Sequence, residues 1–324
     1  RDRSVSRGLG DVYKRQVLMN AIMFDMAVAG STNAVLHILS YAYELGIKLT
    51  LADFEKYAKE IPCINAVVPS GPYTVVDFHY AGGVMNVMKM LESKPYTDVP
   101  SMYGNTWADM LSRVKARENK VIHSREKPLF NEPGLKILRG NLSPNGAIVR
   151  PTAVYDEVKY MKGKAKVFEG DRPAFEAIMA GEIVPGDIIV ICYEGCKGAP
   201  GMKELMLSID ALIGLGLDKS VGLISDARFS GFNYGAIIGH VSPEAYDGGN
   251  IALVENGDEI VIDIPNGEVS MLVSEEELER RRAAWVCPPL KEEKGCLNIF
   301  AKMCRPAEEG GVMQPWDLDA KFHR

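Results

Sequence analysis

The amino-acid sequence predicts an α/β protein in which a helix-rich first part precedes a strand-rich second part. Residues 17–118 contain apolar stretches of helical length and few strand signals. From residue 135 onward the apolar runs are short and β-branched, and Gly, Pro and Asp separate them. Residues 119–134 are polar, contain two prolines and are expected to form a linker. Many short strands with helices among them are typical of a β-barrel or β/β/α domain rather than a regular parallel sheet.

Composition and charge exclude several classes of protein. Of the 324 residues, 47% are hydrophobic and 25% charged, as in ordinary soluble globular proteins. The net charge of -6 and the absence of a long basic run argue against a nucleic-acid partner. No apolar stretch approaches the ~20 residues that span a bilayer, and six scattered cysteines do not suggest a disulfide framework. We therefore expect a cytoplasmic protein that neither crosses a membrane nor binds nucleic acid.

The first 16 residues differ in character from the rest. RDRSVSRGLGDVYKRQ is basic, has almost no apolar pattern and stops where VLMNAIMFDMAVAG begins. We interpret residues 1–16 as a foreign or disordered leader, and a genuine basic N-terminal tail is the alternative. If the leader is foreign, we expect the natural protein to continue upstream of Val17.

Apolar periodicity and capping residues predict the helices of the first part. Residues 17–29 are apolar on nearly all sides, which predicts a buried helix. A second helix is expected to end at Gly46, and Thr50 with Asp53 forms a capping box that opens a third. The expected helices are residues 17–29, 34–45, 51–60, 84–91 and 107–117.

Short β-branched runs predict the strands of the second part. The expected strands are residues 135–138, 147–149, 165–168, 188–192, 220–224, 251–254 and 259–264. The expected helices are residues 172–180, 202–215 and 274–285, the last opened by a capping box from Ser274 to Glu277.

Three glycine-rich segments could bring backbone groups close to a ligand. The first, Gly30–Asn33, separates two apolar helices and is followed by His37. Hydroxyl and amide groups at a helix N-terminus can bind an anion. On spacing alone, a helix break capped by Ser or Thr is the simpler interpretation.

The second segment, Tyr193–Glu204, follows a predicted strand and opens a predicted helix. Its glycines free backbone N–H groups to face a ligand. Glu204 is expected in the first turn of that helix, where a carboxylate can simply complement the helix dipole. The functional alternative makes Glu204 an oxygen ligand of a divalent cation such as Mg²⁺.

The third segment, Ser225–Gly231, directly follows another predicted strand. Ser230 precedes a glycine and could be exposed and reactive, although a turn serine is the simpler interpretation. The residues around Ser230 do not form the G-x-S-x-G pattern. A serine hydrolase is disfavoured, because no histidine is positioned as a base for Ser230.

The six cysteines do not predict a metal site, because no pair has Cys-x-x-Cys spacing. We interpret Cys63, Cys192 and Cys287 as structural. Cys196 lies in the second glycine-rich segment and is predicted to be an exposed thiol without an assigned role.

The chain also contains ordered blocks that include AGSTNAVLH, LKILRGNLSPNGAIV, KGAPGMKE, DARFSG and GHVSPEA. Taken together, these blocks resemble the dihydroxy-acid dehydratase and phosphogluconate dehydratase family, from about Val17 to about Ala284. So many blocks in one order make the resemblance specific at family level. The matching residues are 29–37, 69–84, 135–149, 168–170, 181–204, 226–231, 239–245, 251–266 and 278–285.

The resemblance implies a three-layer α/β N-terminal domain, of which residues 17–118 would be the C-terminal part. It also implies a barrel-like swivelling β/β/α domain at residues 135–290, followed by a C-terminal tail at 291–324. Members of the family are homodimers or tetramers. They join an iron–sulfur cluster, 2Fe-2S or 4Fe-4S, and a Mg²⁺ ion at the cleft between the two domains.

The resemblance further implies a hydro-lyase that dehydrates a small hydroxy acid to a 2-oxo acid. The cluster acts as a Lewis acid on the C3 hydroxyl, because hydroxide is a poor leaving group. Mg²⁺ holds the carboxylate and the C2 oxygen and thereby acidifies the C2 proton. By this match, Ser230 is the base and Glu204 a Mg²⁺ ligand. Arg228 is expected to lower the pKa of Ser230 or to orient its loop.

The sequence departs from the family in two respects. The family's cluster cysteines and a carbamylated lysine precede the AGSTNAVLH block and have no counterpart here, so this chain alone is expected to be inactive. Cys196 replaces a proline, and Phe232–Asn233 replaces a segment that usually contains threonine, which leaves the substrate open. Branched dihydroxy acids of valine and isoleucine synthesis are our first choice, and arabinonate, xylonate or phosphogluconate are the alternatives. A non-catalytic binding module is disfavoured, because Glu204 and Ser230 both lie in matched motifs.

Overall fold

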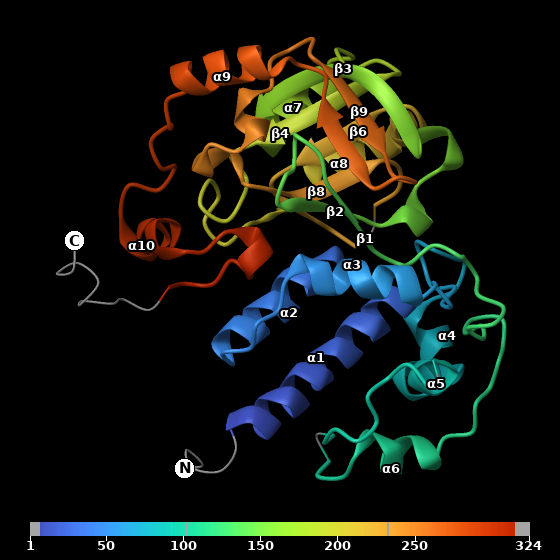
Figure 1. The fold of residues 1–324 in the computed structure, drawn as a ribbon. Coiled ribbons are helices and arrows are strands. Elements are labelled where there is room, and N and C mark those ends of the chain that lie inside the picture. The colour runs from blue at the N-terminus through green and yellow to red at the C-terminus, as the bar shows by residue number, and fades with distance from the viewer. Residues whose placement is uncertain (1–6, 92, 102, 232, 315–324) are drawn as a thin grey trace.

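The computed structural model describes residues 7–91, 93–101, 103–231 and 233–314, which form two groups of elements (Figure 1). An eight-stranded sheet with its covering helices is one group. None of the described helices is long and apolar enough to cross a membrane. The other group, drawn in blue to teal, consists of α1 (Arg7–Val28), α2 (Thr32–Glu44), α3 (Leu51–Glu60), α4 (Val75–Tyr80), α5 (Gly83–Met90) and α6 (Trp107–Ser112).

Helix α1 begins at Arg7 rather than at Val17. Residues 7–16 of the predicted leader are therefore helical and continuous with the apolar helix expected at 17–29. Arg15 forms an ion pair with Asp53 of α3, with 2.6 Å between Nη2 and Oδ1. Residues 7–16 are thus helical rather than disordered, while residues 1–6 lie outside the described part of the chain. That the leader is foreign stays a prediction.

Local capping signals set the starts of the next helices. The Ser31 side chain accepts a hydrogen bond from the Asn33 backbone N–H at the start of α2 (3.2 Å). The Thr50 backbone N–H donates to Asp53 Oδ2 (3.1 Å), so the predicted capping box opens α3, which ends at Glu60 as expected. The sequence did not predict α4, a six-residue helix with no buried residue and hence no apolar repeat.

The eight strands form a nearly closed, barrel-like sheet in the order β1-β2-β8-β6-β4-β3-β9-β10. Neighbours in the run β3, β4, β6 and β8 are parallel, and the other neighbouring pairs are antiparallel. The strands are β1 (Lys136–Leu138), β2 (Gly146–Val149), β3 (Tyr160–Glu169), β4 (Asp187–Cys192), β6 (Gly222–Ser225), β8 (Ile237–Ser242), β9 (Glu259–Asp263) and β10 (Glu268–Met271).

Backbone hydrogen bonds link the two ends of this strand order. The Arg139 N–H, directly after β1, donates to Gly267 O, and Arg139 O accepts from the Val269 N–H of β10, both at 2.9 Å. Closure of this kind protects edge strands from unwanted pairing. The barrel-like sheet and the mixed α/β class are confirmed, including the departure from a regular parallel sheet.

Within the eight-stranded sheet, two strands were not predicted, and one predicted strand is instead a short helix. Strands β8 and β10 were not predicted, and the strand expected at 251–254 is instead the 3₁₀ helix η5 (Asn250–Leu253). Ile251 and Leu253 are buried in the barrel core, so this apolar run serves packing and not strand pairing. Strand β8 contains a glycine and His240, which interrupt the apolar run that would predict a strand. The backbone of His240 is left-handed (φ 55°).

Alternation along β4 divides the core of the second group into two layers. Ile188 and Val190 point into the barrel, whereas Ile189 packs with α7 (Asp171–Met179) and α8 (Leu207–Gly214) on the outside. Both faces of β4 are therefore buried, which explains why its sequence is apolar throughout.

The two groups share apolar and polar contacts where they meet. Ile137 of β1 and Ile148 of β2 are buried within the core of the helical group. Arg139 forms an ion pair with Glu55 of α3 (2.6 Å). The segment 119–134 contains no helix or strand, yet Ile122 within it is completely buried in the same core. The helical group therefore packs directly on the β1–β2 edge of the barrel.

Much of the predicted C-terminal tail is ordered. Helix α9 (Glu275–Ala284) begins where the sequence predicted, and the Ser274 side chain accepts from the Glu277 N–H (3.3 Å). The Glu277 carboxylate pairs with Arg280 instead of completing the capping box. The chain then forms α10 (Gly295–Met303). Glu308 then accepts hydrogen bonds from Ser242 Oγ of β8 and from the Asn145 amide. Residues 291–314 thus pack on the protein, while 315–324 lie outside the described residues.

Candidate functional site

The structure brings the three glycine-rich segments together at one place. The short strands β5 (Glu204–Leu205) and β7 (Arg228–Phe229) pair in parallel, with Glu204 opposite Arg228. Ser230 follows β7 directly. The Asn33 side-chain amide, in the first turn of α2, donates to Glu204 Oε1 (2.5 Å) and to Phe229 O (3.3 Å). One amide therefore joins all three segments.

The sequence suggested that Glu204 lies in the first turn of a helix. In the structure, Glu204 is an exposed residue of strand β5. Helix α8 begins only at Leu207, and Asp171 caps it by accepting from the backbone N–H groups of Leu207 (3.1 Å) and Ser208 (3.0 Å). The helix-dipole role considered for Glu204 is therefore wrong. Its carboxylate contacts Asn33 and is accessible from solvent.

Ser230 is half-buried, and a hydrogen bond from Arg150 fixes the residue that follows it. The Arg150 guanidinium donates through Nη1 to Gly231 O and through Nη2 to Gly30 O, both at 2.7 Å. The residue after Ser230 and the break between α1 and α2 are thus tied to one side chain. Arg150 directly follows the block at residues 135–149 and was not predicted as a site residue.

The Arg228 side chain turns toward the second glycine-rich segment. Its Nε donates to Met202 O (2.5 Å), and its Nη1 lies 3.5 Å from His37 Nε2. Burial and the Arg228 charge lower the pKa of His37. The same two causes, together with the charge of His37, lower the pKa of buried His240 to about 3. Both imidazoles are therefore neutral at pH 7 beside Arg228.

Two buried carboxyl groups shape the glycine loop of the second segment. Asp226 accepts from the backbone N–H groups of Tyr193 (3.1 Å) and Glu194 (3.0 Å). Glu244 accepts from the N–H groups of Lys197 and Gly198, both at 2.9 Å. Burial raises the pKa of Asp226 to about 6 and that of Glu244 to about 8. Asp226 and Glu244 lie in the motifs DARFSG and SPEA, and these positions were the sequence signal that could have indicated their role.

Cys196 is buried, at 1% exposure, which corrects the prediction of an exposed thiol. Its Sγ donates to Met202 Sδ (3.5 Å), and burial raises its pKa well above the ordinary thiol value. Cys63 and Cys192 are buried as expected, whereas Cys287 is exposed. Of the segment 232–233 singled out for the substrate, Asn233 is buried and Phe232 lies outside the described residues.

The described residues do not fit an iron–sulfur cluster. No three His, Cys, Asp or Glu side chains in the described part of the chain are grouped so that they could hold a metal ion. Burial raises the pKa of Cys63 to about 11 and that of Cys304 to about 12, which keeps these thiols protonated. Cluster ligation requires thiolates.

A cavity of about 330 Å³ lies beside the Ser230 turn. Its polar side is formed by Gly30, Ser31, Asn65, Arg150 and Gly231, and the remaining wall is apolar. The apolar wall contains Phe24, Val28, Ala29, Val67, Val68, Pro69, Val75 and Phe78. This combination of an apolar cavity with a few polar groups is typical of a small-molecule site.

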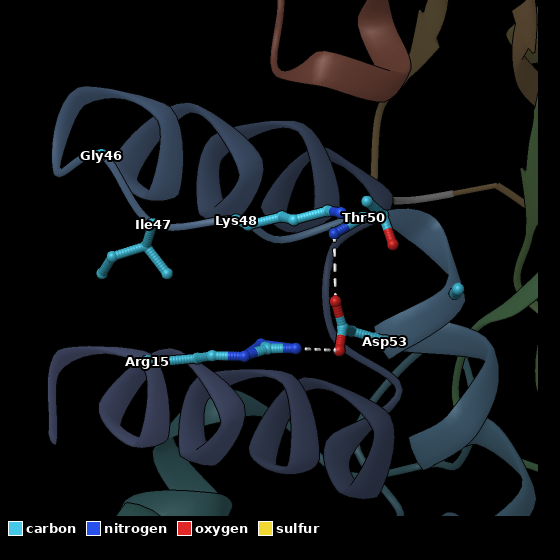
Figure 2. Close-up of a pocket in the computed structure, with 7 residues that line it drawn as sticks. Arg15, Gly46, Ile47, Lys48, Thr50 and Asp53 are labelled. Carbon is cyan, nitrogen blue, oxygen red and sulfur yellow. Dashed lines mark hydrogen bonds and ion pairs between the residues drawn. The ribbon is translucent and has the colours of Figure 1, made fainter. Parts of the chain in front are cut away.

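A larger hollow of about 490 Å³ has no connection with these segments (Figure 2). It lies between α1 and the start of α3, where Arg15 and Asp53 form the ion pair described above. Asp53 also accepts from the Thr50 N–H in the capping box. None of the three glycine-rich segments lines this hollow, so the candidate site is the cavity beside Ser230.

Comparison with known proteins assigns the family. The profile "Dihydroxy-acid/6-phosphogluconate dehydratase C-terminal" matches residues 120–311, and the corresponding N-terminal profile matches residues 4–110. The chain is 44% identical over 309 residues to the dihydroxy-acid dehydratase of Clostridium novyi (strain NT), covering 94% of this chain and 56% of that protein. It is 45% identical over 298 residues to the dihydroxy-acid dehydratase of Methanosarcina barkeri, covering 91% and 54% respectively.

The chain thus spans about half the length of the curated relatives it matches. The matched regions include all three segments that meet at Asn33. On these profiles and identities, the chain belongs to the dihydroxy-acid/6-phosphogluconate dehydratase family.

Proposed function

We propose that this chain contributes to the active site of a hydro-lyase that converts a 2,3-dihydroxy acid into a 2-oxo acid and water. The observation that carries the proposal is the meeting of Glu204, the Ser230 turn and Asn33 beside a cavity. The relatives from Clostridium novyi and Methanosarcina barkeri, both named dihydroxy-acid dehydratase, agree with this chemistry.

Ser230 is the base in this proposal. As its alkoxide it takes the proton from C2 of the substrate, and the C3–O bond breaks. The departing hydroxide takes this proton from the Ser230 hydroxyl and leaves as water, which regenerates the alkoxide. The enol that remains becomes the 2-oxo acid. A serine needs local positive charge to act as a base. Arg228, two residues earlier, and Arg150, bonded to Gly231 O, both lie close to the Ser230 turn.

Glu204 would hold Mg²⁺. Its carboxylate is exposed, and next to it lies Asn33, whose Oδ1 is buried without a hydrogen-bond partner. These are hard oxygen donors, the type that Mg²⁺ prefers, so the residues fit the ion. Bound there, Mg²⁺ would supply positive charge for a substrate carboxylate and make the C2 proton more acidic. The cysteines of this chain do not fit an iron–sulfur cluster, and we assign no step to such a group.

The cavity wall favours a branched aliphatic acid over a sugar acid. Phe24, Val28 and Val67 offer no hydrogen-bonding side chains. A sugar acid would have to bury several hydroxyl groups against this wall, and each unpaired hydroxyl costs about 1–3 kcal/mol. A branched alkyl group has no hydrogen bonds to lose there, so its burial does not carry this cost. We therefore propose that the substrate is a branched dihydroxy acid of valine and isoleucine synthesis, and sugar acids remain the comparison.

The test measures 2-oxo acid formation from 2,3-dihydroxyisovalerate, arabinonate, xylonate and 6-phosphogluconate. The 324-residue chain is assayed alone and fused behind the part of the Clostridium novyi relative that the alignment does not cover. We expect turnover in the fusion, with 2,3-dihydroxyisovalerate as the preferred substrate. Equal or better turnover of a sugar acid would contradict the substrate, and no turnover of any acid by an otherwise cluster-loaded fusion would contradict the activity.

A further inference from the structure

A single buried arginine connects the two groups of elements at the candidate site. Arg150 directly follows β2 and is 5% exposed. Its two terminal nitrogens donate to carbonyls on opposite sides of the junction, Gly30 O in the helical group and Gly231 O in the barrel group, each at 2.7 Å. The planar guanidinium fixes the relative place of both carbonyls, because its N–H groups diverge in a rigid fork.

Asp25 of α1 is a buried acidic residue whose charge acts on Arg150. It is 6% exposed and has one carboxylate oxygen, Oδ2, without a hydrogen-bond partner. Burial raises the pKa of Asp25 to about 7, and the charge of Arg150 opposes the rise. Burial likewise lowers the pKa of Arg150, and the charge of Asp25 opposes that change. Such a buried pair contributes little net stability, so a requirement for geometry explains it better than a requirement for stability.

The packing around Gly30 leaves no freedom for the segment that Arg150 holds. A Cβ at Gly30 would lie 1.8 Å from Asp25 Oδ1, and the Gly30 N–H already donates to Asp25 O (2.9 Å). The chain between α1 and α2 is therefore pressed against Asp25 on one side and bonded to Arg150 on the other. Asn33, which contacts Glu204, follows three residues later.

We propose that Arg150 is a positioning residue that sets the Ser230 turn against the Gly30–Asn33 segment, with Asp25 as its counter-charge. The role rests on the function proposed above, since it matters for catalysis only if Ser230 is the base. Arg150 acts through the backbone carbonyls of Gly30 and Gly231 and not through the reacting atoms. Lysine cannot replace it fully, because one ammonium group does not reproduce the two-pronged geometry.

Hydrogen exchange of the 324-residue chain tests the positioning directly, without substrate. The variants are Arg150→Met, which removes the guanidinium, and Arg150→Lys, which keeps the charge. Arg139→Met is the matched control, because Arg139 also joins the barrel group to the helical group, through Glu55 at the surface. In Arg150→Met, we expect exchange to become about tenfold faster or more in residues 29–34 and 226–231, as loss of charge-assisted bonds implies.

The pattern of exchange decides the proposal. We expect faster exchange confined to the two segments, an intermediate effect in Arg150→Lys, and no change there in Arg139→Met. Unchanged exchange in both segments, or acceleration spread evenly over the chain, would overturn it, because the second outcome describes general loss of stability. If Arg150→Met does not fold, Arg150→Lys decides alone, and wild-type exchange in both segments would then overturn the need for the fork.

The activity assay separates this proposal from the proposed function. In the fusion that forms 2-oxo acid, Arg150→Lys should lower kcat about tenfold with KM little changed, because a displaced base slows the chemical step more than binding. A fusion without any turnover would remove the catalytic role of Ser230 and leave the exchange result intact. A normal kcat in Arg150→Lys together with locally faster exchange would overturn the claim that the positioning serves catalysis.

Discussion

The side-chain amide of Asn33 lies 2.5 Å from Glu204 Oε1, although the two residues are 171 positions apart in the chain. The same amide also reaches Phe229 O, next to Ser230. The helical group therefore contributes a side chain to a site whose other residues belong to the barrel group. The placement of Glu204 depends on contact between the two groups.

This contact predicts a measurable coupling between Asn33 and Glu204. Asn33→Ala and Glu204→Ala should each lower the free energy of unfolding, and the double variant should lose less than the sum. The expected coupling is about 0.5–1.5 kcal/mol, because the pair is exposed and solvent screens the charge. Urea unfolding of the four proteins in a double-mutant cycle measures it. Strictly additive losses would show that the two side chains do not interact in solution.

Ser230→Ala and Glu204→Gln should fail in different ways in the fusion that carries out dehydration. Loss of a general base costs about 10²–10⁴-fold in rate. Ser230→Ala should therefore show little turnover at any Mg²⁺ concentration, with its Mg²⁺ content unchanged. Glu204→Gln removes an anionic ligand and should bind Mg²⁺ more weakly, so that excess Mg²⁺ restores part of the rate. Near-normal turnover by Ser230→Ala on every accepted acid would exclude this serine as the base.

The 324-residue chain alone should not retain an iron–sulfur cluster after anaerobic reconstitution. Its buried thiols, such as Cys63 and Cys304, have raised pKa values and do not ionise readily. Iron and sulfide analysis after desalting, with the visible spectrum, measures the outcome. The chain is accordingly expected to form no 2-oxo acid by itself. Stoichiometric iron and sulfide would show that some cysteines of this chain rearrange to bind a cluster.

Stability should fall as the pH rises above 7, and Glu244 should cause much of the fall. Burial, followed by the charge of Asp226, raises the pKa of Glu244 to about 8 from an ordinary value near 4.5. The folded state therefore binds this proton more tightly than the unfolded state, so its stabilising contribution is complete below the ordinary value and is lost as the pH approaches 8.

Between pH 7 and 8 two buried carboxyl groups release protons with the same sign, Glu244 and Asp25, whose pKa burial raises to about 7. The Glu244→Gln variant separates the contribution of Glu244 from that of Asp25. His240, whose folded pKa of about 3 is depressed, changes stability in the opposite direction, but only between about pH 3 and its ordinary value of 6.5. Urea unfolding between pH 7 and 8 should show a slope of up to about 1.4 kcal/mol per pH unit. Glu244→Gln should reduce this slope, and the exposed control Glu276→Gln should not. If the slope of Glu244→Gln equalled that of the wild type, the pH dependence could not be assigned to Glu244.

Local sequence signals determined the elements that depend on neighbouring residues. The Thr50–Asp53 capping box fixed the start of α3, and its apolar repeat fixed the end, because both act within one or two helical turns. The short, continuous apolar run of β4 and the alternating run of β9 likewise predicted strands. The motifs that contain Glu204 and Ser230 could also be recognised in the sequence, because a glycine-rich turn depends only on neighbouring residues.

The tertiary structure alone decided how these motifs meet. Glu204 became a strand residue because β7 pairs with it, and Cys196 became buried because Leu36 and Cys304 pack around it. Neither partner is near in sequence, so no periodicity could indicate them. Arg150 is the clearest case: its sequence neighbourhood predicts only the end of a strand. Its place between Gly30 and Gly231 arises when the helical group docks on the barrel, because buried carbonyls and a buried charge must find partners there.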